Sequence, residues 1–405
     1  MKQAWPKKRL GDICLVNPRE GKDSLPPERS KVSFVSMSAI DEKAGLIRSQ
    51  EIREYREVAK GYSSFRNNDV LFAKITPCMQ NGKAAIARDL TGGIGFGSTE
   101  FHILRPGPEL LPEWVFAFVR YPLFKISAAA NFTGTAGQQR VSTSFMTNSL
   151  IPVPSLPEQK RIVATLGAAE ELRCLREQAD KRTMDLIPAL FYEMFGDPAV
   201  NDHKFNVVTV GSLFSKIRPG TRCGPFGSAL KKREYVADGI PVWGIDNVKP
   251  NEFTETGSLF ITEEKYAGLK NYIVEPGDIL ISRAGTVGRM CVARPTKHPS
   301  IIGTNLIRLS LDETKVIPEY VSSLFTYFGE RMGKLRAASD EDAYSFVQTG
   351  TLKSLVIPLP PILLQREFSV QIMKVRGMKA CQDESRRRLD NLFQSLLDRA
   401  FRGEA

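Results

Sequence analysis

The chain has 405 residues, of which 42% are hydrophobic and 25% are charged, so two or three globular domains with separate cores are expected. It has no uncharged apolar run of about 18 residues, as a membrane helix needs, and no apolar signal segment near its start, which predicts a cytoplasmic location. The net charge is +11, and residues 1–155 hold 21 basic and 14 acidic residues. This excess indicates either a polyanionic partner or a solvated basic surface.

The six cysteines and three histidines do not form a metal-binding pattern, because no two cysteines lie two to four residues apart. We therefore expect free thiols in a reducing compartment, no metal site and no cofactor on this chain.

Short strand-like segments recur through 1–155 and 199–360, separated by Gly, Asn and Pro. They cover residues 32–35, 70–73, 84–87, 240–243, 278–281 and 290–293. A helix is expected to begin at Pro112, and another at Pro318. These patterns predict two globular domains of α+β or α/β class.

A long amphipathic helix is predicted after each of these regions. The first begins near Ser155, is expected to kink at Pro188 and stops at residues 196–198, and the second begins after Pro361. At 35–40 residues each, they would be roughly 55–60 Å long and would pair antiparallel. Their expected packing residues are Ile162, Leu166, Leu172, Leu175, Phe368, Ile372, Leu389 and Leu392.

The sequence repeats itself at a spacing of 206 residues. Pro152, Pro154 and Gln159 match Pro358, Pro360 and Gln365, and further pairs include Pro112 with Pro318 and Lys83 with Arg289. Two copies predict approximate twofold symmetry, which suits a twofold partner such as duplex DNA or a pair of identical subunits. The expected segments are domains at 1–154 and 198–360, and helical regions at 155–197 and 361–405.

Basic residues follow two Gly-rich segments of the second domain, at residues 223–235 and 277–289. Cations occupy matching places in both copies, at Lys74 and Arg283 and at Lys83 and Arg289. Such loops can contact DNA phosphates or guanine edges, and glutamines can pair with adenine. The alternatives are structural turns with a solvated basic tail, and glutamines bound to their own loop. The DNA-binding candidates are Lys74, Lys83, Gln138, Gln139, Arg140, Lys231, Lys232, Arg233, Arg283 and Arg289.

Catalytic motifs are absent from the sequence. It contains no phosphate-binding loop, no metalloprotease motif and no serine-hydrolase elbow. Asn17-Pro18 is followed by Arg19, which departs from the Asn-Pro-Pro of adenine methyltransferases, and the acidic residues 340–342 indicate a solvated loop. We predict no catalytic residue.

The order of several segments resembles the specificity subunits of type I restriction–modification systems. They are Gly-Pro-Phe-Gly-Ser at 224–228, Gly-Asp-Ile-Leu-Ile-Ser-Arg-Ala-Gly-Thr-Val-Gly at 277–288, the proline-rich helix starts and the ending Ala-Phe-Arg-Gly-Glu at 400–404. The resemblance covers both halves of the chain.

This resemblance implies two target-recognition domains joined by two long helices that pair as an antiparallel coiled coil with pseudo-twofold symmetry. Each domain would read half of a split DNA sequence, and the helices would fix the unspecified gap. Two methyltransferase subunits carrying S-adenosylmethionine would dock on the helices, and motor-nuclease subunits using ATP and Mg would join them. The chain itself would not be an enzyme.

Two departures from the family pattern stand out. Leu364 replaces an expected acidic residue before Gln365, and the first half lacks the Gly-Pro-Phe-Gly-Ser turn, with residues 35–40 in its expected place. The two half-sites should therefore differ. The rival interpretations are a stand-alone DNA methyltransferase and a protein–protein adaptor without a DNA role.

Overall fold

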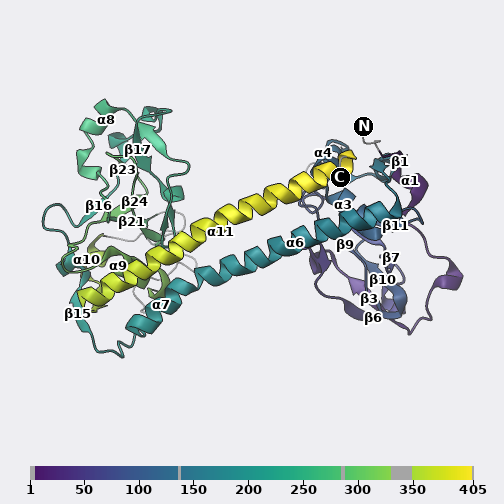
Figure 1. Ribbon diagram of the computed structural model, residues 1–405, viewed down its shortest axis with the longest axis horizontal. Helices are drawn as coiled ribbons and strands as arrows, with labels where there is room; N and C mark the ends of the chain where they lie inside the picture. Colours follow the sequence, from purple (N-terminus) through teal and green to yellow (C-terminus); the bar gives the residue numbers. More distant parts are fainter. Residues whose placement is uncertain (1–4, 136–137, 284–287, 330–348, 404–405) are drawn as a thin grey trace. The chain divides into compact units, whose positions relative to one another are not determined.

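The structure is a computed structural model that describes residues 5–135, 138–283, 288–329 and 349–403 (Figure 1). Gly137, the loop residues 284–287, the acidic residues 340–342 and Gln348 lie outside the described residues. The chain forms two compact units. Unit 1 comprises Met1–Gln178 and Asp383–Ala405, and unit 2 comprises Ala179–Gln382.

Unit 1 contains two four-stranded sheets. The first is antiparallel, with the order β2 (Cys14–Val16), β11 (Phe101–Pro106), β8 (Val70–Ala73) and β9 (Ala84–Ile86). The second contains one parallel pair, β3 with β10, and has the order β6 (Glu51–Glu54), β3 (Lys31–Val35), β10 (Ile94–Gly97) and β7 (Ser63–Arg66). The smaller strands are β1 (Lys7–Arg9), β4 (Ile40–Asp41), β5 (Leu46–Ile47), β12 (Phe132–Thr133), β13 (Arg140–Val141) and β14 (Leu150–Pro152).

Unit 2 repeats this topology, except that its mixed sheet has three strands. Its antiparallel sheet has the order β16 (Thr221–Cys223), β24 (Leu306–Leu309), β21 (Ile279–Ser282) and β22 (Met290–Val292). The mixed sheet has the order β20 (Leu259–Ile261), β17 (Ile240–Trp243) and β23 (Ile301–Ile302), with β17 parallel to β23. The smaller strands are β15 (Asn206–Thr209), β18 (Val248–Lys249), β19 (Glu252–Phe253) and β25 (Val356–Leu359).

Short helices cover the sheets of each unit. Those of unit 1 are α1 (Leu10–Ile13), α2 (Tyr55–Val58), α3 (Pro112–Arg120), α4 (Pro122–Ala130) and α5 (Thr143–Asn148). Those of unit 2 are α8 (Glu263–Ala267), α9 (Pro318–Phe328) and α10 (Thr349–Ser354). The helices predicted from Pro112 and Pro318 are confirmed as α3 and α9, and all six predicted strands are present as β3, β8, β9, β17, β21 and β22.

Three long helical segments complete the two units. They are α6 (Leu156–Met184), α7 (Leu186–Phe195) and α11 (Ile362–Arg402). The kink predicted from Pro188 is confirmed, because the helix breaks at Asp185 between α6 and α7. A proline inside a helix clashes with the carbonyl four residues earlier, which here belongs to Met184.

The helices pair antiparallel within each unit. In unit 1, Arg173 Nε donates to Asp390 Oδ1 at 2.7 Å, while Ile162 and Leu166 line one hollow with Leu396. Along these contacts the residue numbers fall in α6 while they rise in α11, as they do in an antiparallel pair. In unit 2, Gln382 Nε2 donates to Thr183 Oγ1 at 2.9 Å, and the Phe195 ring lies 5.1 Å from that of Phe368. The predicted antiparallel pairing and the α+β class are confirmed.

The packing residues predicted for the helix pair are only partly correct. Ile162, Leu166, Phe368 and Ile372 are buried, and Leu389 is half-buried. Three leucines are instead exposed, by 51% at Leu172, 53% at Leu175 and 49% at Leu392.

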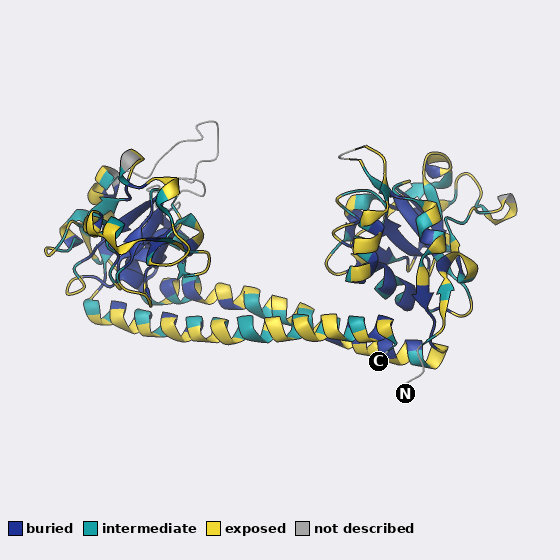
Figure 2. Ribbon diagram, turned by 90° about the horizontal axis from the view of Figure 1, so that it is seen from above, coloured by how far each residue is buried: buried dark blue, intermediate teal, exposed yellow. Residues whose placement is uncertain are grey.

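The contact stripe of α6 runs through polar positions that a search for apolar residues passes over. From Ala169 it continues at steps of four and three to Arg173, Arg176, Asp180 and Thr183. Leu172 and Leu175 lie beside this stripe, since neighbouring helical positions point about 100° apart. Residues along the middle of both helices are accordingly mostly exposed or intermediate (Figure 2).

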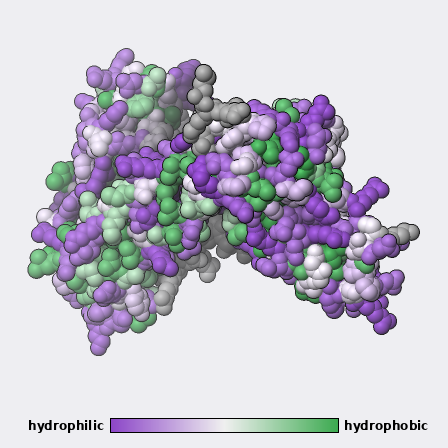
Figure 3. Space-filling model, turned by 45° about the vertical axis from the view of Figure 1, so that its right-hand side comes forward, coloured by the Kyte–Doolittle hydropathy of each residue, from purple (hydrophilic) through white to green (hydrophobic). Residues whose placement is uncertain are grey.

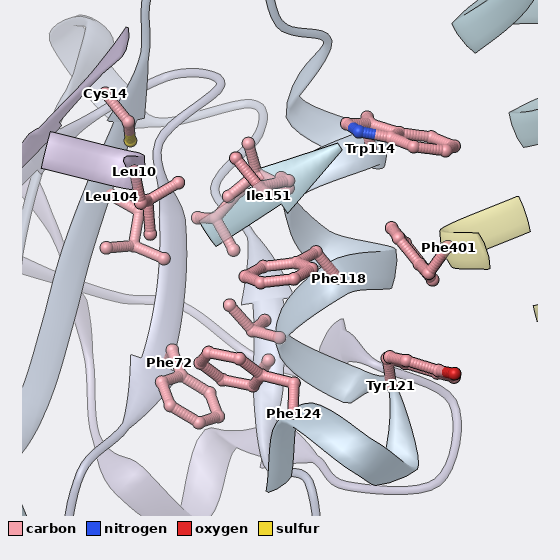
Figure 4. Close-up of a cluster of buried hydrophobic side chains, with 14 of the residues drawn as sticks. Leu10, Cys14, Phe72, Leu104, Trp114, Phe118, Tyr121, Phe124, Ile151 and Phe401 are labelled. Atoms are coloured by element: carbon pink, nitrogen blue, oxygen red, sulfur yellow. The ribbon is translucent and has the colours of Figure 1, made fainter. Parts of the chain in front are cut away.

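The end of α11 closes the core of unit 1. The Phe401 ring lies 4.8 Å from that of Trp114 and 5.1 Å from that of Tyr121, and Phe401 faces both of them and Phe118 (Figure 4). In unit 2 the end of α7 occupies the position equivalent to the end of α11 in unit 1, with the Phe195 ring 5.0 Å from that of Tyr320. Phe195 and Phe401 differ by the repeat spacing of 206. Each core therefore needs a residue from the end of a long helix.

Candidate nucleic-acid interface

The strand registers place two candidate cations at equivalent positions. Lys74 directly follows β8 and Arg283 directly follows β21, and these strands occupy the same place in their sheets. The backbone N–H of Lys74 donates to Glu100 O at 2.9 Å, and that of Arg283 donates to Asn305 O at 3.0 Å. The predicted match of Lys74 with Arg283 is confirmed.

A second matched pair lies where each hairpin returns. Lys83 immediately precedes β9, and its carbonyl accepts from Ala73 N at 3.0 Å. Arg289 precedes β22, and its carbonyl accepts from Ser282 N at 2.8 Å. Each hairpin thus carries one candidate cation on each side of its loop, as the repeat predicts.

Buried carboxylates fix the beginning of both central strands. Asp69 precedes β8 and accepts from Arg66 N at 2.7 Å, and Asp278 precedes β21 and accepts from Glu275 N at 2.8 Å. Both side chains are 1% exposed. Burial raises the pKa of Asp278, against hydrogen bonds and cations that lower it. A strand pinned at its start presents the residue at its other end with little freedom.

The loop after β8 brings the candidates of unit 1 together. The backbone of Thr76 donates to Gln139 O at 3.0 Å, and that of Val141 donates to Lys74 O at 2.9 Å. Lys83 returns to the same loop, and its Nζ donates to Met37 O at 3.3 Å. The set gathered here is Lys74, Lys83, Gln138, Gln139 and Arg140.

Arg140 is paired within this cluster. Its guanidinium donates to both carboxylate oxygens of Glu100 at 2.9–3.1 Å. This hydrogen bonding raises the pKa of Arg140 and holds that of Glu100 below its ordinary value. The pair leaves this surface with less net charge than the sequence suggests.

In unit 2 the Arg283 guanidinium lies over an aromatic ring. Its carbon atom Cζ is 4.5 Å from the ring centroid of Phe226, and Phe226 is 53% exposed. Arg289, on the other side of the hairpin loop, is also exposed. Arg283 itself is half-buried, and it lies with Arg289 at the same end of the four-stranded sheet.

The basic triplet Lys231, Lys232 and Arg233 lies in another part of unit 2. It sits at the 3-10 helix of Lys232–Glu234, where Lys231 N donates to Glu234 Oε2 at 2.6 Å. Glu234 also pairs with Lys265 of α8 at 2.8 Å. All three cations of the triplet are exposed, and their surroundings belong to the sheet β20-β17-β23.

The sequence comparison of the two turns was misaligned. The Gly-Pro-Phe-Gly turn follows β16, and β16 corresponds to β2 in strand order and pairing. Its counterpart in unit 1 is therefore residues 17–21, and not residues 35–40, which follow β3. The repeat spacing of 206 residues agrees with this assignment, because it relates residues 224–227 to residues 18–21.

Three residues of these surfaces escaped the sequence analysis: Phe226, Glu100 and Asn305. The turn signal around Phe226 was recognised, but a contact with Arg283 depends on strand pairing that the sequence does not display. Asn305 is exposed and immediately precedes β24, as Glu100 immediately precedes β11. A comparison of the residues before these two strands would have found both.

The described part of the chain meets the requirements neither for a metal site nor for a membrane-spanning helix. It contains no group of three or more His, Cys, Asp or Glu side chains placed to hold a metal ion. None of its helices combines the length and apolar composition needed to cross a membrane. Burial raises the pKa of Cys14 and of Cys291 to about 12, which makes these thiols unreactive core residues.

The chain is similar to proteins of one kind over nearly its whole length. A family model described as the type I restriction modification DNA specificity domain matches residues 2–178. The Type I restriction enzyme EcoEI specificity subunit of Escherichia coli is 35% identical, covering 98% of this chain and 81% of that protein. The EcoKI specificity subunit of Escherichia coli strain K12 is 24% identical, covering 75% of this chain and 67% of that protein.

Solved structures show the same similarity. A chain from a structure titled as the basis of complex assembly and conformational transition of the type I R-M system is 25% identical, with a TM-score of 0.64. The match covers 99% of this chain and 98% of that chain. The S subunit of the type I restriction–modification system from M. genitalium is 17% identical, with a TM-score of 0.55 and coverage of 98% and 96%, which supports the fold alone.

Proposed function

The chain belongs to the family of type I restriction–modification specificity subunits, and we propose that each of its two units reads one half of a split DNA sequence. Recognition of a DNA sequence is the role of this subunit. The division of that work between two units is our proposal, and it rests on one observation. Two units of the same topology present cations at the same strand end, with different side chains around them.

The matched positions suit recognition of the major groove. Lys74 and Arg283 each stand at the end of a buried strand, and Lys83 and Arg289 stand at the return of the same hairpins. Cations at such places can bind phosphates and hold the duplex, and arginine and lysine also pair with guanine O6 and N7. The glutamines beside Lys74 add side chains that can pair with adenine. The two clusters differ, so the two half-sites should differ.

We further propose that two modification subunits dock on the long helices. The exposed leucines Leu172, Leu175 and Leu392 support this proposal, because a folded chain leaves so many apolar helix residues exposed mainly where another protein covers them. Apolar areas interrupt the otherwise hydrophilic surface (Figure 3). The helices, which run through both units, would set the length of the unspecified gap.

We assign the catalytic steps of the complex to the methyltransferase and motor-nuclease subunits. S-adenosylmethionine would bind the methyltransferase subunits, and ATP and Mg would bind the motor-nuclease subunits. The chain itself would contribute recognition and assembly, and would catalyse no step. The relatives carry the name of specificity subunits, which gives no support to a stand-alone methyltransferase or to an adaptor without a DNA role.

Sequencing of methylated adenines tests this function. Cells that carry the chain with its modification subunits should methylate one motif of two specified parts separated by a fixed gap. The same cells without the chain should show no such methylation. A single uninterrupted motif, or methylation unaffected by loss of the chain, would contradict the proposal.

A further inference from the structure

We propose that Arg376 of α11 fixes the orientation of the four-stranded sheet of unit 2 on its long helix, and with it the gap length that the complex accepts. This inference rests on the proposed function, in which an unspecified gap separates the two half-sites. It adds that helix length alone does not set the gap, because the attachment of a globular part to its helix also contributes. Arg376 is thus a positioning residue, which acts through the turn between β18 and β19.

The attachment is made by two cations that lie within one turn of α11. Arg376 Nη2 donates to Asn251 O at 3.0 Å and lies 3.4 Å from the side-chain oxygen Oδ1 of the same residue. Three positions further along the helix, Lys379 pairs with Glu252, the first residue of β19. The ion pair is partly exposed, so water weakens it, whereas Asn251 is only 3% exposed. The bond from Arg376 is therefore the stronger of the two links.

Asn251 is also held from two other directions. Its backbone N–H donates to Met290 O, in β22, at 2.8 Å. Its side-chain amide donates to Ser323 Oγ at 3.0 Å and accepts from Ser322 Oγ at 3.1 Å, and both serines belong to α9. The φ angle of 54° lies in the left-handed region, which asparagine adopts more readily than most residues. Asn251 therefore connects α11, α9 and the four-stranded sheet.

A short series of bonds leads from α11 to the hairpin that carries the candidate cations. Arg376 bonds to Asn251, and Asn251 bonds to Met290, which directly follows Arg289. The three residues of β22 are 0–3% exposed. Closely packed strands of this kind move together, because the interior leaves little free space. A change in the position of the turn at Asn251 would therefore also move the strand that begins beside Arg289.

Apolar packing holds α11 against unit 2 but defines its orientation less strictly. Ile372 and Val375 belong to the same buried cluster as Ile281 and Met290. Hydrophobic attraction has no preferred direction, whereas a hydrogen bond weakens steeply when its angle departs from the favoured range. Arg376 lies directly after Val375, at the edge of this apolar contact. It therefore adds direction to a contact that apolar side chains alone would leave free to turn.

Unit 1 holds the equivalent hairpin in a different way. Gly45, which lies 206 residues before Asn251, has a φ angle of 66° in the turn between β4 and β5. A Cβ atom built on Gly45 would lie 2.3 Å from Arg120 Nη1, and Arg120 Nη2 donates to Glu42 O at 3.0 Å. Arg120 belongs to α3. The guanidinium on this hairpin therefore comes from a short helix of the globular part.

The long helices use the corresponding positions for different contacts. The repeat spacing relates Arg376 and Lys379 of α11 to Glu170 and Arg173 of α6. In α6 these two residues pair with each other at 2.6 Å, and Arg173 also pairs with Asp390 of α11. In α11 the equivalent residues bind a hairpin of the globular part. The attachment through Arg376 thus distinguishes unit 2 from unit 1.

The test uses the complete chain with its modification subunits, on DNA that keeps both half-sites and varies the gap in steps of one base pair. Methylation rates are measured for the wild type, R376M, R376K and K379M. R366M is the matched control, because it makes the same substitution at an exposed position of α11. S323A removes the bond from the Asn251 side chain to α9 and leaves the bond to Arg376 in place. Thermal unfolding and subunit assembly are measured for every variant.

R376M should reduce the discrimination against neighbouring gap lengths by about tenfold, which is the size expected for one hydrogen bond from a charged group. The two half-sites should stay the same. R376K should keep part of the discrimination, and K379M should lower it about two- to threefold, because its ion pair is partly exposed. R366M should discriminate as the wild type does. S323A should unfold at a lower temperature and still accept a single gap length.

Other outcomes separate the inference from the function on which it rests. An equal loss of methylation at all gap lengths in R376M would make Arg376 a purely structural residue and overturn the inference. A gap preference relaxed as much in S323A as in R376M would assign the effect to lower stability. If R376M does not fold, unchanged discrimination in K379M overturns the inference by itself. A wild-type complex that methylates no split motif would instead overturn the proposed function.

Discussion

Gln159 and Gln365 make the same buried contacts 206 residues apart. The Gln159 side chain accepts from Leu111 N at 2.9 Å and donates to Pro154 O at 2.9 Å. The Gln365 side chain accepts from Ile317 N at 2.9 Å and donates to Pro360 O at 2.7 Å. Both glutamines are fully buried. The strongest signal of the sequence repeat thus marks the joint between a long helix and its globular part.

Replacing either glutamine should destabilise one unit. Q159A removes the acceptor of a buried backbone N–H, and we expect unit 1 to lose about 2 kcal/mol of its free energy of unfolding. Q365A should have the same effect in unit 2. Urea unfolding followed by hydrogen exchange separates the two units. Q394A, at an exposed position of α11, is the control and should leave the free energy of unfolding unchanged. An equal loss of stability in both units from Q159A would contradict the assignment.

The exposed leucines of α6 should matter for assembly and not for folding. The double variant L172E/L175E places charges at two exposed positions outside the core of the chain. Its thermal unfolding should therefore match that of the wild type. Its affinity for the modification subunits, measured by analytical ultracentrifugation, should fall at least about tenfold, since charges at a buried interface are unfavourable. I126E, at a 65% exposed position of α4, should assemble normally. Unimpaired assembly of L172E/L175E would place the partner elsewhere.

Acid should destabilise unit 1 through His102. Burial lowers the pKa of His102 to about 4, and its neutral ring donates from Nε2 to Val141 O at 2.8 Å while Nδ1 accepts from Asn17. The His102 side chain binds a proton near pH 6.5 in the unfolded chain, but only near pH 4 in the folded chain. The free energy of unfolding therefore decreases as pH falls from 6.5 towards 4.

Between pH 7.5 and 5.5 this effect amounts to about 1 kcal/mol. Denaturant midpoints at the two pH values measure it, and most carboxylates remain charged over this range. H102Q should be less stable at pH 7.5 and should lose this part of the pH dependence. A pH dependence that H102Q retains in full would assign the effect to other groups.

The sequence predicted the elements that local patterns encode. Residues 70–73 and 240–243 form strands with the predicted bounds, since their β-branched and aromatic residues lie between turn formers. The matching of Lys74 with Arg283 was also predicted, although the pair is 209 residues apart, because each residue directly follows a short apolar strand. Strand partners could not be predicted, and with them the contact of Phe226 with Arg283.

The helix contact was predicted at its ends and missed in its middle. Ile162 and Phe368 are apolar and follow the pattern, whereas Arg173 and Thr183 face the other helix through an ion pair and a hydrogen bond. Polar residues at a contact look like surface residues in a single sequence. The neighbouring Leu172 and Leu175 were predicted to face the other helix, because an apolar side chain can pack either against that helix or against another protein.

The most direct test of the two-reader account is an exchange of one reader. Strands β1 and β14 pair Lys7 with Pro152, so both ends of residues 7–152 lie side by side and can be joined to the same segment of a relative with another target. With its modification subunits, the exchanged chain should methylate a motif in which one half is new while the other half and the gap are unchanged. Alteration of both halves, or of neither, would contradict the claim that each unit reads one half-site.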